Sequence, residues 1–481
     1  MSYVYDKRKP YRTYLEEYAP KWDGMAHLRR DENGILEVRF HTDDGPVRFC
    51  EAIHAGYLGL LHDISHDPDN EIVILTGTGD SFVALSLVYP VQTLMIAVCV
   101  GVGVGFNALL SRRLGEGRRE EADRVTANGY FLYLVCWLVF LVLGVSLARP
   151  FLTLFSDVPQ VVTYGSQYLA IVTGASLGIC MQFAGERTLQ ATGNTVGPMV
   201  IQGIGAVINL ILDPLLIFGI GPFPKLEVAG AAIATVTGQL VGMVVGLVMV
   251  RRTPSVTLSF RAFRPVPAIL ADMLRVGIPA AMVQALATVM NLGMNLILPL
   301  FTSAGVFILG AYFKLQSFLF MPLYGITNAL VPIISFNYGA RYKARITGTI
   351  RFALSLAVGL MVVGTAVMML LPGPLLGIFE ADAAVLAEGI PALRVIALSF
   401  LCAGVSIVLC SALQALGSAN ASLVITLLRQ VALLLPAALV LGTIRTGLVW
   451  ASFPVAELVS CAVALLLCRS VLHRRLDGLE A

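Results

Sequence analysis

One carboxylate stands out because it lies in an otherwise apolar stretch of the sequence. Asp213 follows Asn209 by four residues and precedes Pro214. In a helix this spacing places the amide and the carboxylate on one face, and Pro214 has no N–H, which leaves the carbonyl of Leu210 free. Three oxygens on one face suit a hard monovalent cation, or a desolvated carboxyl that exchanges protons. The alternative is an Asp that only satisfies backbone groups at a helix end.

Other polar side chains lie in apolar stretches of the second half of the chain. Glu457 is the main acidic candidate there. A further set could line a substrate cavity or form hydrogen bonds within a helix bundle, namely Gln284, Lys314, Gln316, Met321, Arg429 and Gln430. Met321 and its neighbours Phe320 and Tyr324 could hold a lipophilic cation. The alternative for each of these three is core packing.

Several common kinds of site are excluded. The pattern Gly101-x-Gly103-x-Gly105 lacks the spacing of a dinucleotide fingerprint, and the sequence has no GxxxxGK[ST]. An ion gradient is therefore the expected energy source. The eight cysteines include no CxxC, which indicates inert buried thiols. No basic strip interleaved with aromatics predicts nucleic-acid binding. We expect no cofactor, and no metal other than Na+ at Asp213 and Asn209.

The composition shows what kind of structure must position these residues. The chain has 481 residues, of which 57% are hydrophobic and 13% charged, with mean hydropathy +0.81. Soluble domains carry about 25% charged residues, so an ordinary cytosolic enzyme is excluded. The charge is unevenly divided: residues 1–82 hold 24 charged side chains, and the other 399 residues hold 39. The sequence thus joins two unlike pieces.

From residue 83 onward, apolar segments long enough to cross a bilayer recur. The eleven predicted segments are 83–110, 129–148, 164–185, 197–219, 228–250, 276–300, 306–334, 352–371, 389–415, 421–442 and 447–468. The loops on one side carry 18 Lys and Arg residues, including Arg187, and those on the other carry three. The positive-inside rule then predicts a cytoplasmic C-terminus. We expect a monomeric, multi-pass protein of the inner membrane.

With eleven segments and a cytoplasmic C-terminus, residue 82 would lie on the outer side of the membrane. The first 30 residues contain no apolar signal that would export the segment before it. An internal repeat explains this conflict. Residues 109–115 match 333–339, and residues 189–193 match 413–417, both at an offset of 224. The second half then has six helices and the first half has five. The counterpart of the helix at 277–300 would fall near 53–76, which is polar, so the first membrane helix is predicted to be absent.

Four motifs resemble the multidrug and toxic compound extrusion (MATE) transporters of the MOP flippase superfamily. They are LQATGNT at 189–195, NLILDPLLIFG at 209–219, VAGAAIAT at 228–235 and PIISFNYGA at 332–340. The resemblance covers residues 81–475. It implies two six-helix lobes and an antiporter that exports organic cations in exchange for H+ or Na+.

The resemblance also implies a cation site at Asp213 and Asn209, with the hydroxyl of Thr235 as a further ligand. Thr235 neighbours a stripe of small residues at every fourth position, which predicts close helix packing: Gly230, Ala234, Gly238, Gly242 and Gly246. The family's site also receives an Asp from the first helix, so we expect impaired transport in this chain. The family members with acids in helices seven and ten are not matched, because Gln284 and Arg394 stand in those segments.

Residues 27–82 resemble the opening of a crotonase (enoyl-CoA hydratase and isomerase) superfamily protein. A strand and turn at 33–46, a helix to about Ile64 and a strand within 67–82 make one strand-helix-strand unit. The family's catalytic residues come from later sequence, so no catalytic residue is expected and the chain is not predicted to be an enzyme.

The expected fold is an all-α integral membrane protein, a two-lobed MATE-like bundle with eleven membrane helices, preceded by a small incomplete α/β fragment. The predicted divisions are 1–82 (fragment), 83–250 (first lobe), 251–275 (cytoplasmic linker) and 276–475 (second lobe). The expected partners are organic cations, H+ or Na+, and the lipid bilayer. Two alternatives remain: a crotonase-like hydrolase on a membrane anchor, and a lipid or polysaccharide flippase with a strongly cationic central cavity.

Overall fold

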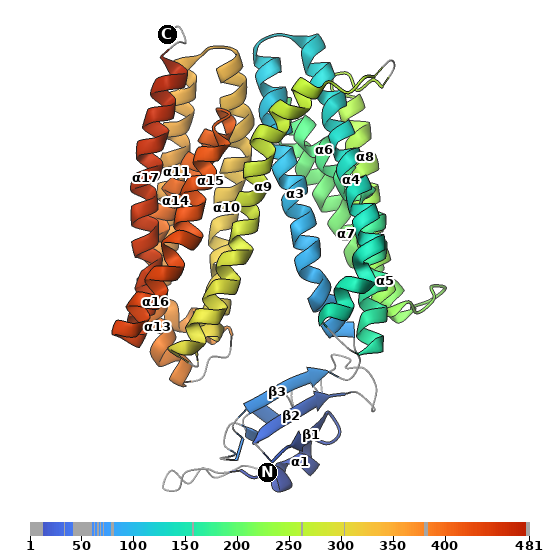
Figure 1. Ribbon diagram of the computed structural model, residues 1–481, viewed down its shortest axis with the longest axis vertical. Coiled ribbons are helices and arrows are strands. Elements are labelled where there is room, and N and C mark those ends of the chain that lie inside the picture. The colour runs from blue at the N-terminus through green and yellow to red at the C-terminus, as the bar shows by residue number, and fades with distance from the viewer. Residues whose placement is uncertain are drawn as a thin grey trace. The chain divides into compact units, whose positions relative to one another are not determined.

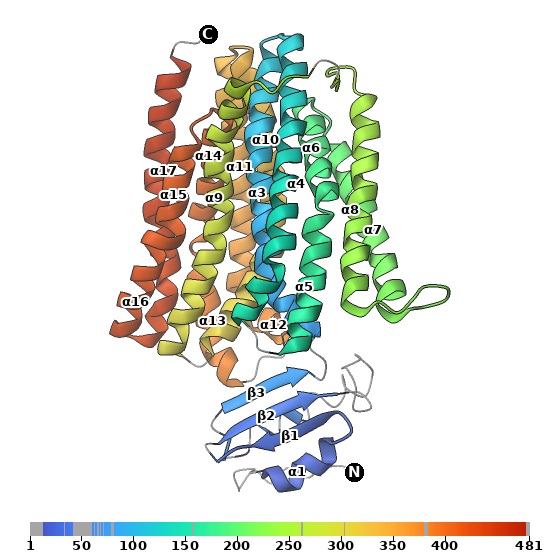
Figure 2. The same ribbon diagram turned by 45° about the vertical axis from the view of Figure 1, so that its right-hand side comes forward.

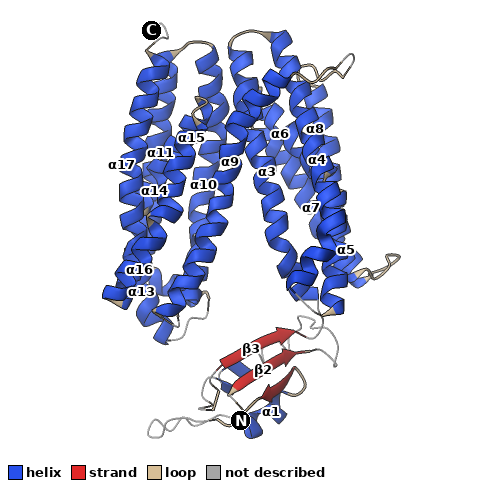
Figure 3. Ribbon diagram, viewed as in Figure 1, coloured by secondary structure: helices blue, strands red, loops and turns tan. Residues whose placement is uncertain are grey.

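The computed structural model is mostly helical, and its strands lie within residues 26–77 (Figures 1 and 3). The described residues are 13–32, 34–41, 60–61, 63–64, 67, 69–70, 72–77, 81–155, 158–260, 263–302, 304–379 and 383–477. The chain divides into two compact units. One comprises Met1–Tyr89, Ser146–Leu169 and Glu227–Ala229, and the other comprises the remaining residues.

The N-terminal segment forms a small three-stranded sheet with helix α1 (Leu15–Trp22). Strand β1 (Ala26–Arg30) pairs antiparallel with β2 (Ile35–Phe40), and β2 pairs parallel with β3 (Ile72–Gly77). A parallel pair needs a crossover connection, and residues 60–61 and 63–64 are helical. The predicted strand-helix-strand order is therefore present, although the predicted turn at 42–46 and the helix before residue 60 lie outside the described residues.

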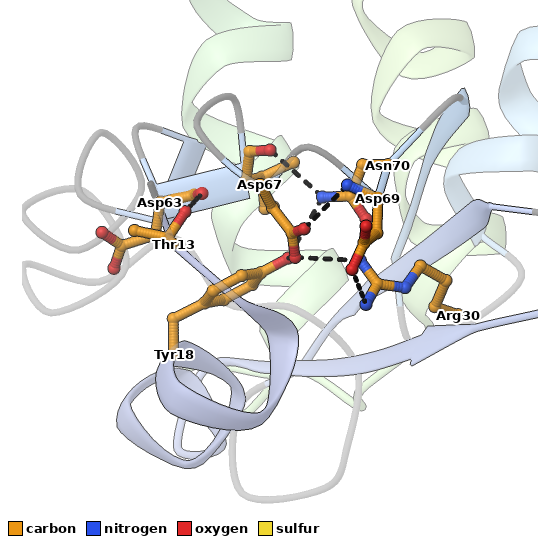
Figure 4. Close-up of polar contacts among 8 residues, drawn as sticks. Thr13, Tyr18, Arg30, Asp63, Asp67, Asp69 and Asn70 are labelled. Atoms are coloured by element: carbon orange, nitrogen blue, oxygen red, sulfur yellow. Dashed lines mark hydrogen bonds and ion pairs between the residues drawn. The ribbon is translucent and has the colours of Figure 1, made fainter. Parts of the chain in front are cut away.

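A buried carboxylate connects α1, β1 and the residues before β3 (Figure 4). The Tyr18 hydroxyl donates to Asp67 Oδ2 at 3.0 Å, and Arg30 Nη1 donates to the same oxygen at 2.9 Å. Asn70 Nδ2 in turn donates to the Tyr18 hydroxyl at 3.1 Å. Burial raises the pKa of Tyr18 to about 12, so it stays a hydrogen-bond donor at neutral pH. Because each group is partnered, the polar cluster adds order to a small apolar core of Leu36 and its neighbours.

The rest of the described chain is helical. The longer helices are α3 (Ser81–Gly115), α4 (Arg119–Phe155), α5 (Pro159–Gly174), α6 (Leu177–Ala191), α7 (Val196–Phe218), α8 (Glu227–Arg251), α9 (Pro267–Ile297), α10 (Gly305–Gly339), α11 (Lys343–Leu370), α13 (Ala383–Ala397), α14 (Phe400–Ala415), α15 (Ala419–Leu427), α16 (Leu434–Ile444) and α17 (Ser452–Leu476). Short turns complete the set: η1 (Leu298–Leu300), α12 (Pro372–Gly377), η2 (Leu428–Ala432) and η3 (Thr446–Ala451).

Among the described residues, nine helices are long and apolar enough to cross a membrane. The number rises to eleven if each of two bent pairs, α5 with α6 and α13 with α14, makes one span. Each of the eleven corresponds to one predicted segment. The helices extend beyond the apolar segments because their polar end turns continue the backbone hydrogen bonding. For this reason α9 already begins at Pro267, and residues 267–275 of the predicted linker are helical.

The predicted repeat is confirmed by the helix positions. Adding 224 to the bounds of α3 gives the bounds of α10, and the start of α4 maps onto the start of α11. The segment 420–442, which corresponds to α7, is divided among α15, η2 and α16. The counterpart of α9 would cover residues 43–73. The described part of that range contains four helical residues and the start of β3, and no membrane helix.

The two halves meet through a reciprocal contact between α3 and α10. A Cβ atom on Gly115 would collide with the carbonyl oxygen of Phe336, and one on Gly339 would collide with the carbonyl oxygen of Arg112. Because 115 and 339, like 112 and 336, are 224 positions apart, each contact is the repeat of the other. Glycine at both positions is what lets the two helices approach so closely.

Gly339→Ala is therefore expected to destabilise the protein by about 1–3 kcal/mol, because the new methyl group meets backbone that cannot move cheaply. Gly348→Ala on α11 is the matched control, since a Cβ there meets nothing within 4 Å. Thermal unfolding in detergent should show a lower midpoint for Gly339→Ala than for the control. Equal midpoints would contradict this account of the α3–α10 contact.

Candidate functional site

The candidate cation site depends on a close approach of α7 and α8, which run side by side (Figures 1 and 2). A Cβ on Gly238 of α8 would lie 2.6 Å from the carbonyl oxygen of Gly205 on α7. A Cβ on Gly230 would lie 2.6 Å from the carbonyl oxygen of Leu216. The predicted small-residue stripe is thus confirmed as a packing surface. Its effect is to bring polar side chains of the two helices within contact distance.

The three predicted cation-site residues come together at this approach. Asn209 Nδ2 lies 3.3 Å from Asp213 Oδ1 on its own helix and 3.3 Å from Thr235 Oγ1 on α8. All three side chains are half-buried. A half turn of the Asn amide presents its oxygen from the same position. The arrangement can then offer carboxylate, amide and hydroxyl oxygens to one small cation.

The charge of Asp213 has no counter-ion among the described residues. Within the part of the chain that the structure describes, no Lys, Arg or His lies at ion-pair distance from this carboxylate. A charge at the centre of a membrane helix costs about 2.5–3.5 kcal/mol on insertion scales. An external cation would remove this cost by neutralising the carboxylate, which is the chemistry that the sequence predicted for this position.

Glu186 is an acidic residue that the sequence analysis missed. It lies on α6, is 4% exposed, and accepts hydrogen bonds from Gln182 at 3.0 Å and from Gln202 of α7 at 3.2 Å. The predicted membrane segment ended at 185, where the charged pair Glu186 and Arg187 begins, whereas α6 continues to Ala191. The spacing of Gln182, Glu186 and Gln190 at every fourth residue is the signal that could have found it.

The assignment of Arg187 to a cytoplasmic loop was wrong. α6 continues to Ala191, and Arg187 is 8% exposed within it. Its Nη1 donates to Gln190 Oε1 at 2.8 Å, and Asn107 of α3 donates to its backbone carbonyl at 3.3 Å. Arg187 is therefore buried within the first half of the bundle rather than lying in a loop.

Three of the six predicted cavity residues gather in the second half. Gln316, Arg429 and Gln430 surround a cavity of about 30 Å³ together with Glu457, which has room for about one water molecule. Arg429 Nε lies 2.6 Å from Glu457 Oε1, with the two side chains only 14% and 12% exposed. The Nε–H of Arg429 is not aimed at the carboxylate, so charge attraction holds Arg429 and Glu457 together.

Arg429 and Gln430 lie in the π-helical turn η2, a kind of turn that is common at functional sites.

The other three predicted cavity residues do not join this cluster. Gln284 and Lys314 are exposed, and Met321 is 65% exposed. Lys314 Nζ lies 5.7 Å from the ring centroid of Phe379, which is a cation–π distance. Sequence periodicity places a residue on a helix but does not show which face the neighbouring helices cover.

Comparison with known proteins agrees with this architecture. The family model MatE matches residues 72–215 and 279–440. A FAD transporter of Shewanella oneidensis is 28% identical over 365 residues, covering 75% of this chain and 80% of that protein. The multidrug export protein MepA of Staphylococcus saprophyticus is 26% identical over 403 residues, covering 83% and 88%.

Solved structures of similar fold include an outward-facing multidrug resistance MATE family transporter of the MOP superfamily. Its TM-score is 0.77 at 23% identity, covering 83% of this chain and 89% of that chain. A MATE in complex with MaL6 also has a TM-score of 0.77, at 22% identity. The proteins named here are transporters, so the resemblance of residues 27–82 to crotonases stays a prediction. The family match, which covers more than half of the sequence and both sets of helices, shows that the chain belongs to the MATE family of multi-pass membrane transporters, which are not enzymes.

Proposed function

We propose that this protein exports hydrophobic organic cations in exchange for H+ or Na+. The observation that carries the proposal is the meeting of Asp213, Asn209 and Thr235 at the α7–α8 approach, with no internal counter-ion for the carboxylate among the described residues. The relative named as a multidrug export protein supports the same class of cargo. Family membership supports a transporter, and the exchangeable charge supports coupling to an ion.

The site can couple an ion to cargo by changing its charge. With H+ or Na+ bound, the Asp213 site is neutral, and once the ion leaves, the carboxylate is charged again. Alternating access would come from rocking of the two repeats about a central cavity. Each turnover would then release the ion and take up cargo on the cytoplasmic side, and release the cargo and take up a new ion on the outer side. We infer that the protein works as a monomer in the inner membrane, with its C-terminus in the cytoplasm.

For the cargo side we propose the predicted polar set, with Gln316, Arg429 and Gln430 as its core and Gln284, Lys314 and Met321 toward its edge. Glu457 lies against Arg429 and offsets its positive charge. A lipid or polysaccharide flippase would need a strongly cationic cavity. The ion pair therefore favours organic-cation export over this alternative.

The N-terminal segment adds a second proposal. We infer that residues 27–82 are a crotonase-like fragment without catalytic residues. In that case a first membrane helix is missing from the described bundle, and the site lacks the carboxylate that such a helix supplies in the family. We expect the exchange to be slow for this reason.

The test is transport by the purified chain in proteoliposomes. Vesicles receive an imposed pH or Na+ gradient, and ethidium, FAD and a lipid-linked sugar are followed in separate arms. We expect slow gradient-dependent ethidium movement that an ionophore collapses. Movement of FAD or the lipid-linked sugar without ethidium movement would replace the proposed cargo class, and ethidium movement that ignores both gradients would refute the coupling.

A further inference from the structure

Two cavities related by the repeat lie where α3 and α10 end. The first, about 280 Å³, is lined by residues of α3, α9, α10, the end of α14 and α17, and we call it the cationic cleft. The second, about 540 Å³, is lined by the corresponding parts with the two halves exchanged, so that α10 takes the place of α3, and we call it the apolar cleft. Nine of the twelve residues that line the apolar cleft are 224 positions away from a residue that lines the cationic cleft.

The two clefts differ in chemistry at equivalent positions. Arg112 and Arg113 line the cationic cleft where Phe336 and Asn337 line the apolar one, and Tyr338 takes the place of Leu114. Both clefts lie at the same end of the bundle. The general excess of Arg on one membrane side therefore does not explain why the cationic cleft has four Arg residues and its counterpart has none.

Two of the four guanidinium groups are partly neutralised. Arg112 Nε lies 3.1 Å and Arg113 Nη1 2.7 Å from the carboxylate of Glu116, and Arg113 also lies 3.2 Å from Glu121. Partial burial raises the pKa of Glu116, but the two guanidinium groups outweigh burial and lower it overall. Glu116 is thus ionised at neutral pH. The Arg112 guanidinium also lies 5.0 Å from the Tyr338 ring centroid, which holds it at the edge of the cleft.

The other two guanidinium groups are not paired with a carboxylate of the described residues. Arg275 of α9 and Arg475 of α17 line the cleft and are exposed. Neither is in an ion pair with another described residue. Asp272 is the one carboxylate among the lining residues. Counting Glu116 and Glu121 as well, the four Arg residues face three acids, two of which also pair with Arg118. The surplus positive charge therefore includes that of Arg275 and Arg475.

We propose that the cationic cleft binds a phosphate-bearing anion. Arg presents paired N–H donors that match phosphate oxygens, and basic pockets between membrane helices on the cytoplasmic side bind anionic head groups. The cleft volume equals that of about nine water molecules, which is enough for a phosphate group. Because Arg112 belongs to the first half and Arg275 and Arg475 to the second, the anion bridges the halves at this end. The proposal does not depend on the cargo or the coupling ion.

The anion can be a lipid head group or a soluble phosphate, and the experiment separates the two. Full-length protein in a neutral detergent is titrated with sodium pyrophosphate in one arm and with phosphatidylglycerol in mixed micelles in the other. Matched NaCl and phosphatidylcholine are the references. The readout is the thermal unfolding midpoint. We expect a saturable rise in at least one arm, and that arm identifies the source.

Two double variants locate the binding. Arg275→Gln with Arg475→Gln removes the unpaired charges of the cleft, and the half-saturating concentration should rise at least about tenfold. Arg264→Gln with Arg474→Gln removes two exposed charges that do not line the cleft, and should leave it unchanged. All four side chains are exposed, so folding is not at issue. No rise in either arm, or equal losses in the two double variants, would overturn the proposal.

Discussion

Asp213→Asn is expected to abolish proton- or sodium-driven efflux, leaving the rate of protein-free vesicles. The substitution keeps the size and the hydrogen bond to Asn209 but removes the exchangeable charge. Because a charge in a membrane helix costs about 2.5–3.5 kcal/mol, the variant should unfold at the same temperature as the unmodified protein or a higher one. Loss of flux without loss of stability separates an ion-coupling role from a structural role.

Matched variants make this test sharper. Glu120→Gln removes an exposed acid in the first turn of α4 and should leave efflux unchanged. Thr235→Ala removes one neutral ligand and should weaken the ion dependence, so that a steeper gradient is needed for the same rate. Undiminished efflux by Asp213→Asn in vesicles where the unmodified protein is active would refute the assignment of the site.

The second large effect concerns the buried ion pair of Arg429 and Glu457. Replacing either residue alone by Met is expected to destabilise the protein by about 3–5 kcal/mol, because the remaining charge is buried without a partner. Among the residues that the structure describes, Glu457 Oε2 already has no hydrogen-bond partner, so none of these groups is in place to compensate. Thermal unfolding in detergent measures the effect.

The double variant Arg429→Met with Glu457→Met is the control for this prediction. Both charges are then absent, and the expected stability lies within about 1.5 kcal/mol of the unmodified protein. A double variant as unstable as the single variants would show that packing around η2, rather than the charge balance, holds this region together.

The candidate cation site could be predicted from the sequence because its main determinant is local. Asn209 and Asp213 are four residues apart on one helix, and helix geometry alone places them on one face. Thr235 lies 26 residues later, and only the family resemblance connected it with the pair. The order of the helices in the second half was likewise predictable, because the repeat carries it from one half to the other.

The pair of Arg429 and Glu457 could not be predicted in the same way. The two residues lie on different helices, and the π-helical turn η2 shifts the face on which Arg429 lies relative to a regular helix. Glu186 was missed for a different reason. The charged pair Glu186 and Arg187 directly follows an apolar run, so hydropathy ended the predicted segment at 185 although α6 continues to Ala191.

The glycine contact between α3 and α10 bears on how the chain arose. Two identical polypeptides that associate across a twofold axis make every contact twice, once in each direction. Gly115 and Gly339 repeat this behaviour within one covalent chain. If two copies of a half-length ancestral gene were joined end to end, the contact between the two halves would be the former homodimer interface. The sequences of the two halves could then diverge while this glycine contact was kept.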